Sequence, residues 1–536
     1  MSRRSHQNHV LHSVRIDPEK CNGCVVCTRA CPAKAIRIRN DKAVILADLC
    51  IECGECIRVC PHEAVLPVLS TDQDRAAFKV TAILPSPVLY TQFGENVMPN
   101  EILLGLSKCG FDHVFDLAKY CEWVNLVTSV WLARHPMIKT AIAPTCPVIV
   151  RLVAARFPDL IPNIVPVEPP REIGARHIRR LLTRRLGLAE ENIGVFHITP
   201  CAAKVVAISN PLTHKESALN GVLGMNDLYG EIRRAITNLT EEDLERVLFH
   251  SGGFGISRDI GNLGGDEKTL SVTGMSDTLE VLEQIESGGL LDVRYVDCRV
   301  CQGGCLGGPL TVENRYLADV TMRNLVQMFG PRPRVRAAEI APLLNEGFFW
   351  SDREIEPVSR SLDPDPIKAM RKLKKVDELA GRLPGKMCAV CGAPDCRTLA
   401  EDVVLGDADL FVCPVFFRMR TWGRRQTTLA EIADKLGLKL QTPGTSLDRT
   451  VAGVYVGDFL EDAADSREGR LWATWRVRPD AVETAVRNAL SGIVVAHGQQ
   501  PEKEMLALAE KEGMPVLTTD VPVYEICGQM YSLLAG

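Results

Sequence analysis

Residues 297–308 of this chain read Asp297-Cys298-Arg299-Val300-Cys301-Gln302-Gly303-Gly304-Cys305-Leu306-Gly307-Gly308. Cys301 and Cys305 lie four positions apart, with glycines between and after them. Because glycine has no Cβ atom, backbone amides in this stretch can approach a bulky inorganic group closely. Two cysteines cannot hold an iron–sulfur cube, so we expect its other ligands to come from elsewhere in the chain.

Two further cysteines follow short apolar runs that are typical of buried strands. Cys146 comes shortly after the run 139–143, and Cys201 comes shortly after the run 193–198. A third run, 80–84, ends in Pro85-Ser86-Pro87. We expect the three strands to form a parallel sheet with the site at the edge where their carboxyl ends meet.

The dispersed cysteine pattern resembles the catalytic domain of iron-only (FeFe) hydrogenases over residues 78–344. In that family four such cysteines hold a cubane, and the last one bridges to a two-iron unit, completing the H-cluster. The resemblance implies that the cubane ligands are Cys146, Cys201, Cys301 and Cys305, with Cys305 as the bridge. It also implies that Lys204 donates to the diatomic ligands of the diiron unit, and that Pro85 and Ser86 contribute to binding it.

The composition is that of a large soluble protein with several domains. The chain has 536 residues, 46% hydrophobic and 24% charged, and a net charge of −5, which argues against a dedicated nucleic-acid binder. No apolar run is long enough to span a membrane, and the polar amino terminus lacks the apolar core of a signal peptide. We therefore expect a cytoplasmic location, where cysteines are metal ligands more often than disulfides.

The amino-terminal part contains two tight cysteine repeats, each ending in Cys-Pro, at residues 21–32 and 50–61. This spacing resembles bacterial dicluster ferredoxins, in which the fourth cysteine of each repeat crosses to the other cubane. A zinc site would lack the Cys-Pro ends. We expect a 4Fe-4S dicluster domain at 16–72 after a disordered tail at 1–15, in which His6, His9 and His12 are solvated, with adventitious metal binding as the alternative. The first cluster would use Cys21, Cys24, Cys27 and Cys60, and the second Cys50, Cys53, Cys56 and Cys31.

A third cysteine group lies beyond the hydrogenase-like domain (73–345) and an expected linker and helix (346–382). It resembles the one-cubane module of electron-transfer proteins and hydrogen-sensing hydrogenase relatives, placed here at 383–420. Its ligands would be Cys388, Cys391, Cys396 and Cys413. The remaining cysteines are expected to be small buried residues: Cys109, Cys121, Cys298 and Cys527.

The carboxy-terminal residues 421–536 alternate strand-like and helical runs, including one βαβ unit at 492–518 and a capping box from Thr428 to Glu431. This part of the sequence resembles the DRTGG domain, a family associated with ligand sensing and regulation. Here the motif reads Asp448-Arg449-Thr450-Val451-Ala452, without the two glycines. This domain would bind an unknown small ligand or serve packing and homodimer formation. The fold class as a whole is multidomain α/β.

Three local expectations concern the hydrogenase-like domain. Asn100 should cap a short amphipathic helix that ends at Gly110. Residues 171–186 should form a helix with an arginine stripe, which is either a solvated face or a docking surface for an acidic redox partner. The glycines at 252–255 should form a turn, because they lack the context of a phosphate-binding loop.

In the hydrogenase family, protons reach the cluster through carboxylates and a thiol that adjoins one ligand cysteine. Thr145 replaces that thiol here. A thiol with a pKa of about 8.5 can exchange protons near neutral pH, whereas an alcohol cannot act as a stepwise relay. The family's buried glutamates correspond to positions near Val127, Thr128 and Trp131, although Glu122 lies close by.

The methionines that flank the family's diiron unit correspond to Thr199 and Arg299. An arginine at this position would favour the reduced, more negative cluster. The resemblance therefore implies that all the clusters needed for electron transfer are present, whereas the residues around the diiron unit differ from those of the family.

Three functions fit these observations. The first is a sensory or regulatory hydrogenase-like protein with four 4Fe-4S clusters, a diiron unit and little hydrogen turnover. The second is an active iron-only hydrogenase that uses another proton route, and the third is an electron-transfer subunit without the diiron unit. Since no flavin or nicotinamide fingerprint is present, a separate ferredoxin or flavoprotein is the expected partner.

Overall fold

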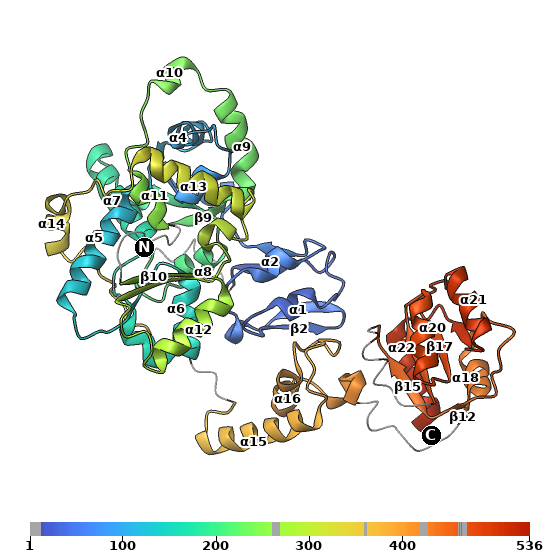
Figure 1. The fold of residues 1–536 in the computed structure, drawn as a ribbon. Helices are drawn as coiled ribbons and strands as arrows, with labels where there is room; N and C mark the ends of the chain where they lie inside the picture. Colours follow the sequence, from blue (N-terminus) through green and yellow to red (C-terminus); the bar gives the residue numbers. More distant parts are fainter. Residues whose placement is uncertain are drawn as a thin grey trace. The chain divides into compact units, whose positions relative to one another are not determined.

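The structure is a computed structural model that describes residues 12–259, 268–358, 362–416, 427–458, 460, 463 and 469–535. The chain divides into two compact units, Met1–Ser361 and Leu362–Gly536, and each is described by itself (Figure 1). In the described parts of the chain, no helix combines the length and apolarity that a bilayer crossing requires.

The amino-terminal module is built from two similar halves (Figure 1). Two antiparallel strand pairs flank two short helices: β1 (Val14–Ile16) with β4 (Val65–Pro67), β2 (Ile36–Arg39) with β3 (Lys42–Ile45), α1 (Val26–Ala30) and α2 (Glu55–Val59). The expected tail is wrong for residues 12–15, because His12 and Ser13 bind Glu52 and β1 begins at Val14. His6 and His9 lie outside the described residues.

The hydrogenase-like part contains two parallel sheets rather than one. The first has the order β6-β5-β8-β9, and the second has the order β10-β11-β7. Their bounds are β5 (Val80–Pro85), β6 (His113–Val114), β7 (Ala141–Ile142), β8 (Ile193–Thr199), β9 (Gly221–Gly224), β10 (Thr269–Thr273) and β11 (Tyr295–Arg299). The expectation of a single sheet is therefore wrong: the run before Cys146 pairs with β11 instead of β5 or β8.

Helices cover both sheets and carry three buried apolar clusters between them. They are α3 (Asp72–Ala76), α4 (Pro99–Ser107), α5 (Ala118–Arg134), α6 (Pro147–Arg156), α7 (Pro170–Leu186), α8 (Ala203–Ser209), α9 (Met225–Thr237), α10 (Glu241–Leu244), α11 (Gly253–Asp259), α12 (Met275–Glu286), α13 (Arg315–Phe329) and α14 (Ala337–Asn345). Asn100 does not cap α4, which starts one residue earlier. Its side-chain oxygen instead accepts hydrogen bonds from the amides of Leu248 and Phe249.

The arginines of α7 mostly bind the protein itself. Arg176 donates to the carbonyl oxygen of Phe348 at 2.6 Å, and Arg179 donates to the carbonyl oxygen of Ala218 at 2.8 Å. Arg180 pairs with Glu346 at 3.1 Å. The prediction of a solvated face is therefore wrong for Arg176 and Arg179, whereas Arg180, Arg184 and Arg185 are exposed, and the docking surface stays a prediction.

Residues 346–358 belong to the first unit and are not a free linker. Phe348 and Phe349 are buried in the same apolar cluster as Trp123, and the amide of Val358 donates to the carbonyl oxygen of Ala154 at 2.8 Å. The expected linker is therefore wrong for this segment, since its aromatic side chains are part of the core.

The glycines at 252–255 lead into helix α11 and do not form the expected turn. A Cβ atom on Gly253 would lie 2.4 Å from the carbonyl oxygen of Val326 in α13, and one on Gly255 would lie 2.3 Å from that of Ala118 in α5. The glycines therefore allow α11 to pack closely against two helices.

We expect Gly255→Ala to lower the free energy of unfolding by about 1–3 kcal/mol, because the added methyl group must displace backbone atoms of α5. Gly230→Ala is a matched control on exposed α9, where the nearest atom to an added Cβ is 3.8 Å away. That variant should be unchanged or more stable by up to about 1 kcal/mol. Denaturant unfolding of both variants measures the difference, and equal stabilities would contradict the packing argument.

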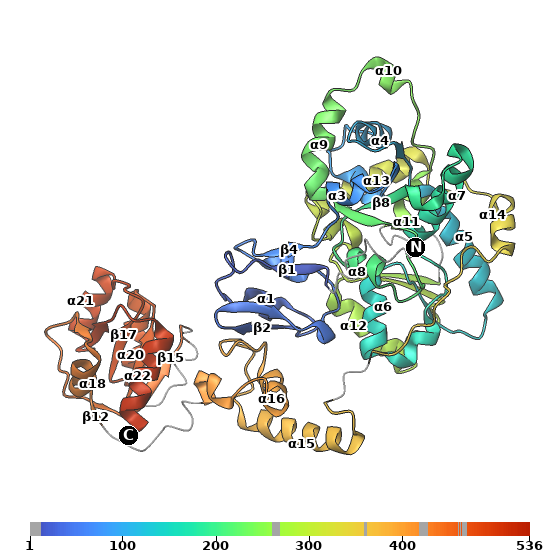
Figure 2. The same ribbon diagram turned by 180° about the vertical axis from the view of Figure 1, so that it is seen from behind.

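The second unit holds a small helical module and a carboxy-terminal α/β domain. In the module, α15 (Pro366–Arg382) packs against α16 (Cys396–Leu405) around Val376 and Leu399. The domain's sheet, seen from behind in Figure 2, has the order β13-β18-β17-β16-β15, and β13 is its antiparallel strand.

The predicted βαβ unit is confirmed, because β17 and β18 pair in parallel and α21 connects them. Thr428 caps α18 as predicted, by accepting the amide of Glu431. The elements are β12 (Thr427–Thr428), α18 (Leu429–Leu436), β13 (Lys439–Leu440), β14 (Thr450–Val451), β15 (Gly453–Val456), β16 (Arg470–Thr474), α20 (Pro479–Arg487), β17 (Gly492–Val495), α21 (Lys503–Lys511), β18 (Val516–Thr518) and α22 (Val523–Ala535).

Candidate iron–sulfur site

Four cysteines meet at the carboxyl ends of strands from both parallel sheets. Cys146 lies between β7 and α6, Cys201 between β8 and α8, and Cys301 just after β11, while Cys305 lies in a short 3-10 turn, Gly304–Gly307. All four line one cavity of about 540 Å³, including its opening to solvent. The fold thus brings together cysteines that are up to 159 positions apart in the sequence, from 146 to 305.

The loop around Cys301 and Cys305 depends on its glycines. A Cβ atom on Gly307 would lie 2.0 Å from the carbonyl oxygen of Gln302, and one on Gly308 would lie 2.4 Å from that of Pro200. Gly303 adopts a φ of 79°, a value that favours glycine. Glycine is therefore needed here so that the loop can close against the Pro200–Cys201 segment.

The electrostatics of the cavity suit a positively charged metal group. Burial raises the pKa of Cys301 well above its ordinary value, and the neighbouring charges of Cys201, Cys305 and Cys146 raise it further. Four buried thiolates repel one another unless a metal group compensates their charge. The donor set and the cradle of close-packed glycines fit a cubane, which these four residues would hold.

Lys204 lines the same cavity and is oriented by His197, a residue that the sequence did not single out. Its Nζ donates to His197 Nε2 at 3.2 Å, while His197 Nδ1 donates to the carbonyl oxygen of Leu84 at 2.7 Å. Burial, followed by the charge of Lys204, holds the pKa of His197 well below its ordinary value. The neutral imidazole therefore accepts the hydrogen bond that holds the Lys204 side chain in position. A histidine inside the apolar run of β8 is the only sequence signal that could have indicated this role.

Of the other predicted site residues, two line the cysteine-lined cavity and two do not. Thr145 and Arg299 line the cavity, and Arg299 pairs with buried Asp297 at 2.9 Å. Among the described residues that line the cavity, neither Pro85 nor Ser86 is found. They lie at the end of β5, where the amide of Ser86 donates to the carbonyl oxygen of Ile198, and their role toward a cofactor stays a prediction.

Thr199 supports the backbone of a ligand loop and is not among the described residues that line the cavity. Its Oγ1 accepts a hydrogen bond from the amide of Cys201 at 3.0 Å. This contact fixes the turn that carries Cys201. Thr199, which the sequence aligned with a methionine beside the diiron unit, therefore holds the backbone of the ligand Cys201 in place.

Helix α5 offers the cavity no carboxylate among its described residues. Val127, Thr128 and Trp131 are buried, and none of them lines the cavity. Glu122 is 2% exposed, and its Oε2 accepts hydrogen bonds from the amides of Arg334 and Val335 at 2.7 and 3.0 Å. Glu122 therefore anchors a backbone segment instead of facing the cavity.

The amino-terminal module groups its cysteines in two sets. Cys21, Cys24, Cys27 and Cys60 line one cavity. In the other set, burial followed by the charges of Cys50, Cys31 and Cys27 raises the pKa of Cys56. Amide-to-sulfur hydrogen bonds typical of cluster ligands are present in both sets: from Ala43 to Cys21 at 3.4 Å, Ala35 to Cys31 at 3.2 Å and Ala64 to Cys60 at 3.3 Å.

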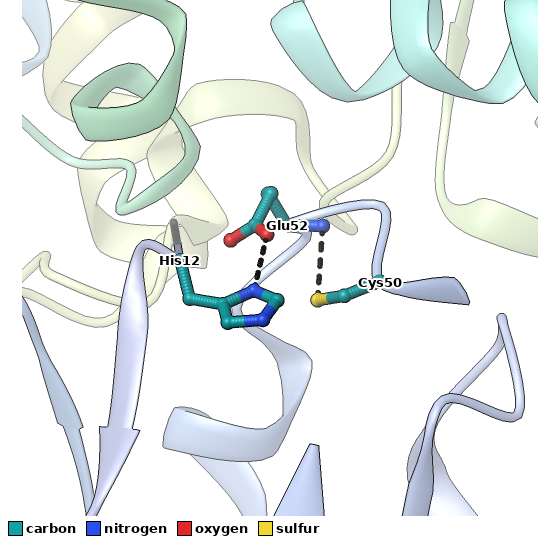
Figure 3. A group of neighbouring side chains, drawn as sticks. All are labelled: His12, Cys50 and Glu52. Carbon is teal, nitrogen blue, oxygen red and sulfur yellow. Dashed lines mark hydrogen bonds and ion pairs between the residues drawn. The ribbon is translucent and has the colours of Figure 1, made fainter. Parts of the chain in front are cut away.

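A group of polar side chains supports the second set (Figure 3). His12 Nδ1 lies 2.9 Å from Glu52 Oε1, and the amide of Glu52 donates to the sulfur of Cys50 at 3.4 Å. The three possible ligand atoms of these residues lie within 4.8 Å of one another. Because Cys50 is a predicted cluster ligand, we interpret His12 and Glu52 as its support and not as a separate metal site. The expectation that His12 is solvated is therefore wrong.

The second ferredoxin set adjoins the cavity of the hydrogenase-like part. The charge of Cys53 contributes to the raised pKa of Cys301. A Cβ atom on Gly54, whose φ is 73°, would lie 2.9 Å from the Pro309 side chain and 3.8 Å from that of Ala202. This close approach would allow single electrons to pass between the two cysteine sets.

In the second unit, the third cysteine group also converges. Burial raises the pKa of Cys391 to about 11, and the charges of Cys413, Cys388 and Cys396 contribute. The amide of Phe416 donates to the sulfur of Cys413 at 3.4 Å. These four residues could hold one further cubane.

The Asp448-Arg449-Thr450 motif of the carboxy-terminal domain has structural contacts. Arg449 donates to the carbonyl oxygens of Gly513 and Leu490, at 2.5 and 3.4 Å. The arginine therefore ties the motif to the turns before β17 and β18. A ligand for this domain stays a prediction.

The parallel sheets and the cysteine-lined cavities define an iron–sulfur redox protein. Residues 79–265 match the family described as iron only hydrogenase large subunit, C-terminal domain. Residues 13–61 match a 4Fe-4S dicluster domain, and residues 383–415 match a small Fe-S cluster family. Residues 79–265 are thus similar to the iron-only hydrogenase family, and iron–sulfur modules match on either side of them.

One curated relative is the "NADP-reducing hydrogenase subunit HndD" of Solidesulfovibrio fructosivorans, which is 23% identical over 332 residues. The match covers 49% of this chain and 56% of the relative, so the chain spans about half of that protein's length. A solved variant of [FeFe]-hydrogenase HydA1 from Chlamydomonas reinhardtii is similar at 14% identity with a TM-score of 0.42, covering 52% of this chain and 95% of that one.

The CBS and DRTGG domains of a Clostridium perfringens pyrophosphatase are also similar, at 23% identity with a TM-score of 0.17. This similarity covers 20% of this chain and 46% of that chain.

Proposed function

We propose that this chain holds four 4Fe-4S clusters and a diiron unit at Cys305, and that it senses hydrogen or redox state with only slow hydrogen turnover. One observation carries the proposal. The cavity that gathers Cys146, Cys201, Cys301 and Cys305 also includes Lys204, yet Thr145 stands where a relay thiol would be needed. When bound, the diiron unit would supply the metal at which hydrogen is split or formed.

Slow turnover follows from the residues around the cavity. A threonine hydroxyl does not ionise near neutral pH, and the described face of α5 offers Val127 and Trp131 instead of carboxylates. A positioned acid or base typically contributes ~10²–10⁴ in rate. Loss of such groups would leave a site that can exchange electrons readily and protons poorly.

Electron exchange is supported by the approach of Cys53 to Cys301. Paired cubanes pass single electrons, so the amino-terminal module would connect the site to an external ferredoxin or flavoprotein. The curated relative is named as a subunit of an NADP-reducing hydrogenase, which is consistent with a multi-chain redox partnership. The carboxy-terminal domain would add regulation, through a small ligand or a homodimer contact.

An active hydrogenase is the second candidate. The buried side chains of Glu168 and His214 favour it, because they lie beside a neighbouring cavity and could carry protons. This candidate differs from the first in rate and not in cofactor content.

We expect matured, anaerobically purified protein to show infrared bands from iron-bound CO and cyanide. It should contain about 18 iron atoms per chain, against about 16 for four cubanes without the diiron unit. Hydrogen uptake with an artificial dye should be slow. Ordinary hydrogenase rates would support the second candidate, whereas a spectrum without these bands would leave an electron-transfer subunit.

A further inference from the structure

A buried group of two carboxylates and one imidazole lies behind the site. Glu168 and Glu172 are 0% exposed and His214 is 2% exposed. Glu168 Oε2 lies 2.9 Å from His214 Nδ1, and Glu172 Oε1 lies 3.6 Å from His214 Nε2. The imidazole therefore bridges the two carboxylates, with a different ring nitrogen facing each one.

This group lies beside two cavities that share part of a wall. His214 lines a second cavity of about 320 Å³, including its opening to solvent, and Pro147 and Arg171 line both this cavity and the cysteine-lined one. Arg171 Nη1 donates to the carbonyl oxygen of Thr145 at 3.4 Å, and its Nε lies 3.9 Å from Glu172 Oε1. Glu172 therefore lies next to Arg171 of the shared wall, and His214 lies between Glu172 and the second cavity.

A purely structural role accounts for only part of the group. Glu172 is well satisfied, because it accepts hydrogen bonds from Ser217 Oγ and the amide of Ala218, each at 2.9 Å. Among the described residues, however, Glu168 Oε1 and His214 Nε2 have no hydrogen-bond partner. Buried polar atoms left in this way are costly, which points to a function for them.

We propose that Glu168, His214 and Glu172 form the proton route between the second cavity and the hydrogenase-like site. This inference rests on the proposed function, because it supplies that site with protons. Starting from a neutral ring protonated at Nε2, His214 accepts a proton at Nδ1 from the Glu168 carboxyl as its Nε2 proton passes to the Glu172 carboxylate. Glu168 is left as a carboxylate that is reprotonated from the outer side, and Glu172 as an acid that releases its proton toward the cysteine-lined cavity.

Arg171 directs this transfer without taking part in it. Its guanidinium has no acceptor and no lone pair to relay a proton, and it lies 3.9 Å from Glu172 at the shared wall. The gaps of 3.6 Å and 3.9 Å in the group exceed direct hydrogen-bond reach, so the transfer requires a side-chain movement or an intervening water at each gap. The polar lining of Thr213, Arg151 and His214 makes the second cavity suitable for water.

The protonation preferences of the group support the transfer. Burial opposes the charged form of His214, yet its pKa is raised overall by the hydrogen bond to Glu168 and the charges of Glu172 and Glu168, against that of Arg171. Burial raises the pKa of Glu168, and Glu172 raises it further, against His214 and Arg176. The raised carboxyl pKa helps Glu168 to hold a proton, and the raised imidazole pKa helps His214 to accept one, as a relay requires.

The test uses matured full-length protein with Glu168→Gln and His214→Gln. Glu122→Gln is the matched control, because Glu122 is an equally buried carboxylate that does not line either described cavity. The first readout is the reduction-induced infrared difference spectrum in H₂O and D₂O, in which a protonated carboxyl gives an isotope-sensitive carbonyl band. The second readout is the rate of exchange between H₂ and D₂O.

We expect the carboxyl band in the wild type and in Glu122→Gln, and its loss in Glu168→Gln. Exchange should slow by ~10-fold or more in Glu168→Gln and His214→Gln. Unchanged bands and exchange rates within twofold of the control would overturn the route while leaving the CO and cyanide bands, and thus the proposed function, intact. Absence of those bands from the wild type would overturn both proposals.

Discussion

Thr145→Cys is expected to raise the hydrogen-oxidation rate of matured protein by ~10², the lower end of what a positioned acid or base contributes. Thr145 lines the cavity beside the ligand Cys146, and its carbonyl oxygen contacts Arg171. A thiol at this position could exchange protons near neutral pH, which the hydroxyl cannot do. Dye-coupled hydrogen uptake at several pH values measures the gain.

Thr145→Ser is the matched control for this substitution, since it keeps a hydroxyl group and should not increase the rate. The double variant Thr145→Cys with His214→Gln tests whether the new thiol draws on the proposed route. If it does, most of the gain should disappear in the double variant, giving a large coupling energy. An equal gain with and without His214 would separate the thiol from that route, and a gain in the serine variant would contradict the relay argument.

The cysteine pattern predicted which side chains would meet, and in this fold the carboxyl ends of strands from both sheets face the same cavity. It could not predict that β7 leaves the first sheet. β7 has only two residues, and its partner β11 lies about 150 positions away, from 141 to 295. Pairing over such a separation is decided by packing, which a local pattern does not record.

The supporting residues were the least predictable part of the site. His214 and Glu168 come from separate loops and carry no spacing signal, so only the folded chain shows that they lie 2.9 Å apart. The arginines of α7 do carry a spacing signal, but it predicts the wrong environment for two of them. Their spacing indicates an exposed stripe, but Arg179 and Arg176 reach carbonyl groups on neighbouring segments.

Cys301→Ala should remove the iron of one cubane and abolish the CO and cyanide bands, whereas Cys298→Ala should retain both. The two cysteines lie three positions apart, Cys298 buried and Cys301 half-buried, and of the two only Cys301 lines the cavity. Its pKa is raised by burial and then by the charges of Cys201, Cys305 and Cys146, as expected when four sulfurs face one another. Cys298 instead lies within β11, where removal of the thiol group costs packing and a contact with Thr278 but no cavity ligand.

Iron per chain, infrared bands and thermal unfolding distinguish these two outcomes. Because the ferredoxin set around Cys53 adjoins Cys301 without sharing its ligands, Cys301→Ala should leave the amino-terminal cubanes reducible and the fold intact. Their electrons would then lack an inner acceptor, and dye-coupled hydrogen uptake should fall to background. Equal iron loss in both variants would mean that this segment serves folding and not ligation, and the assignment of the four cysteines to one cluster would fail.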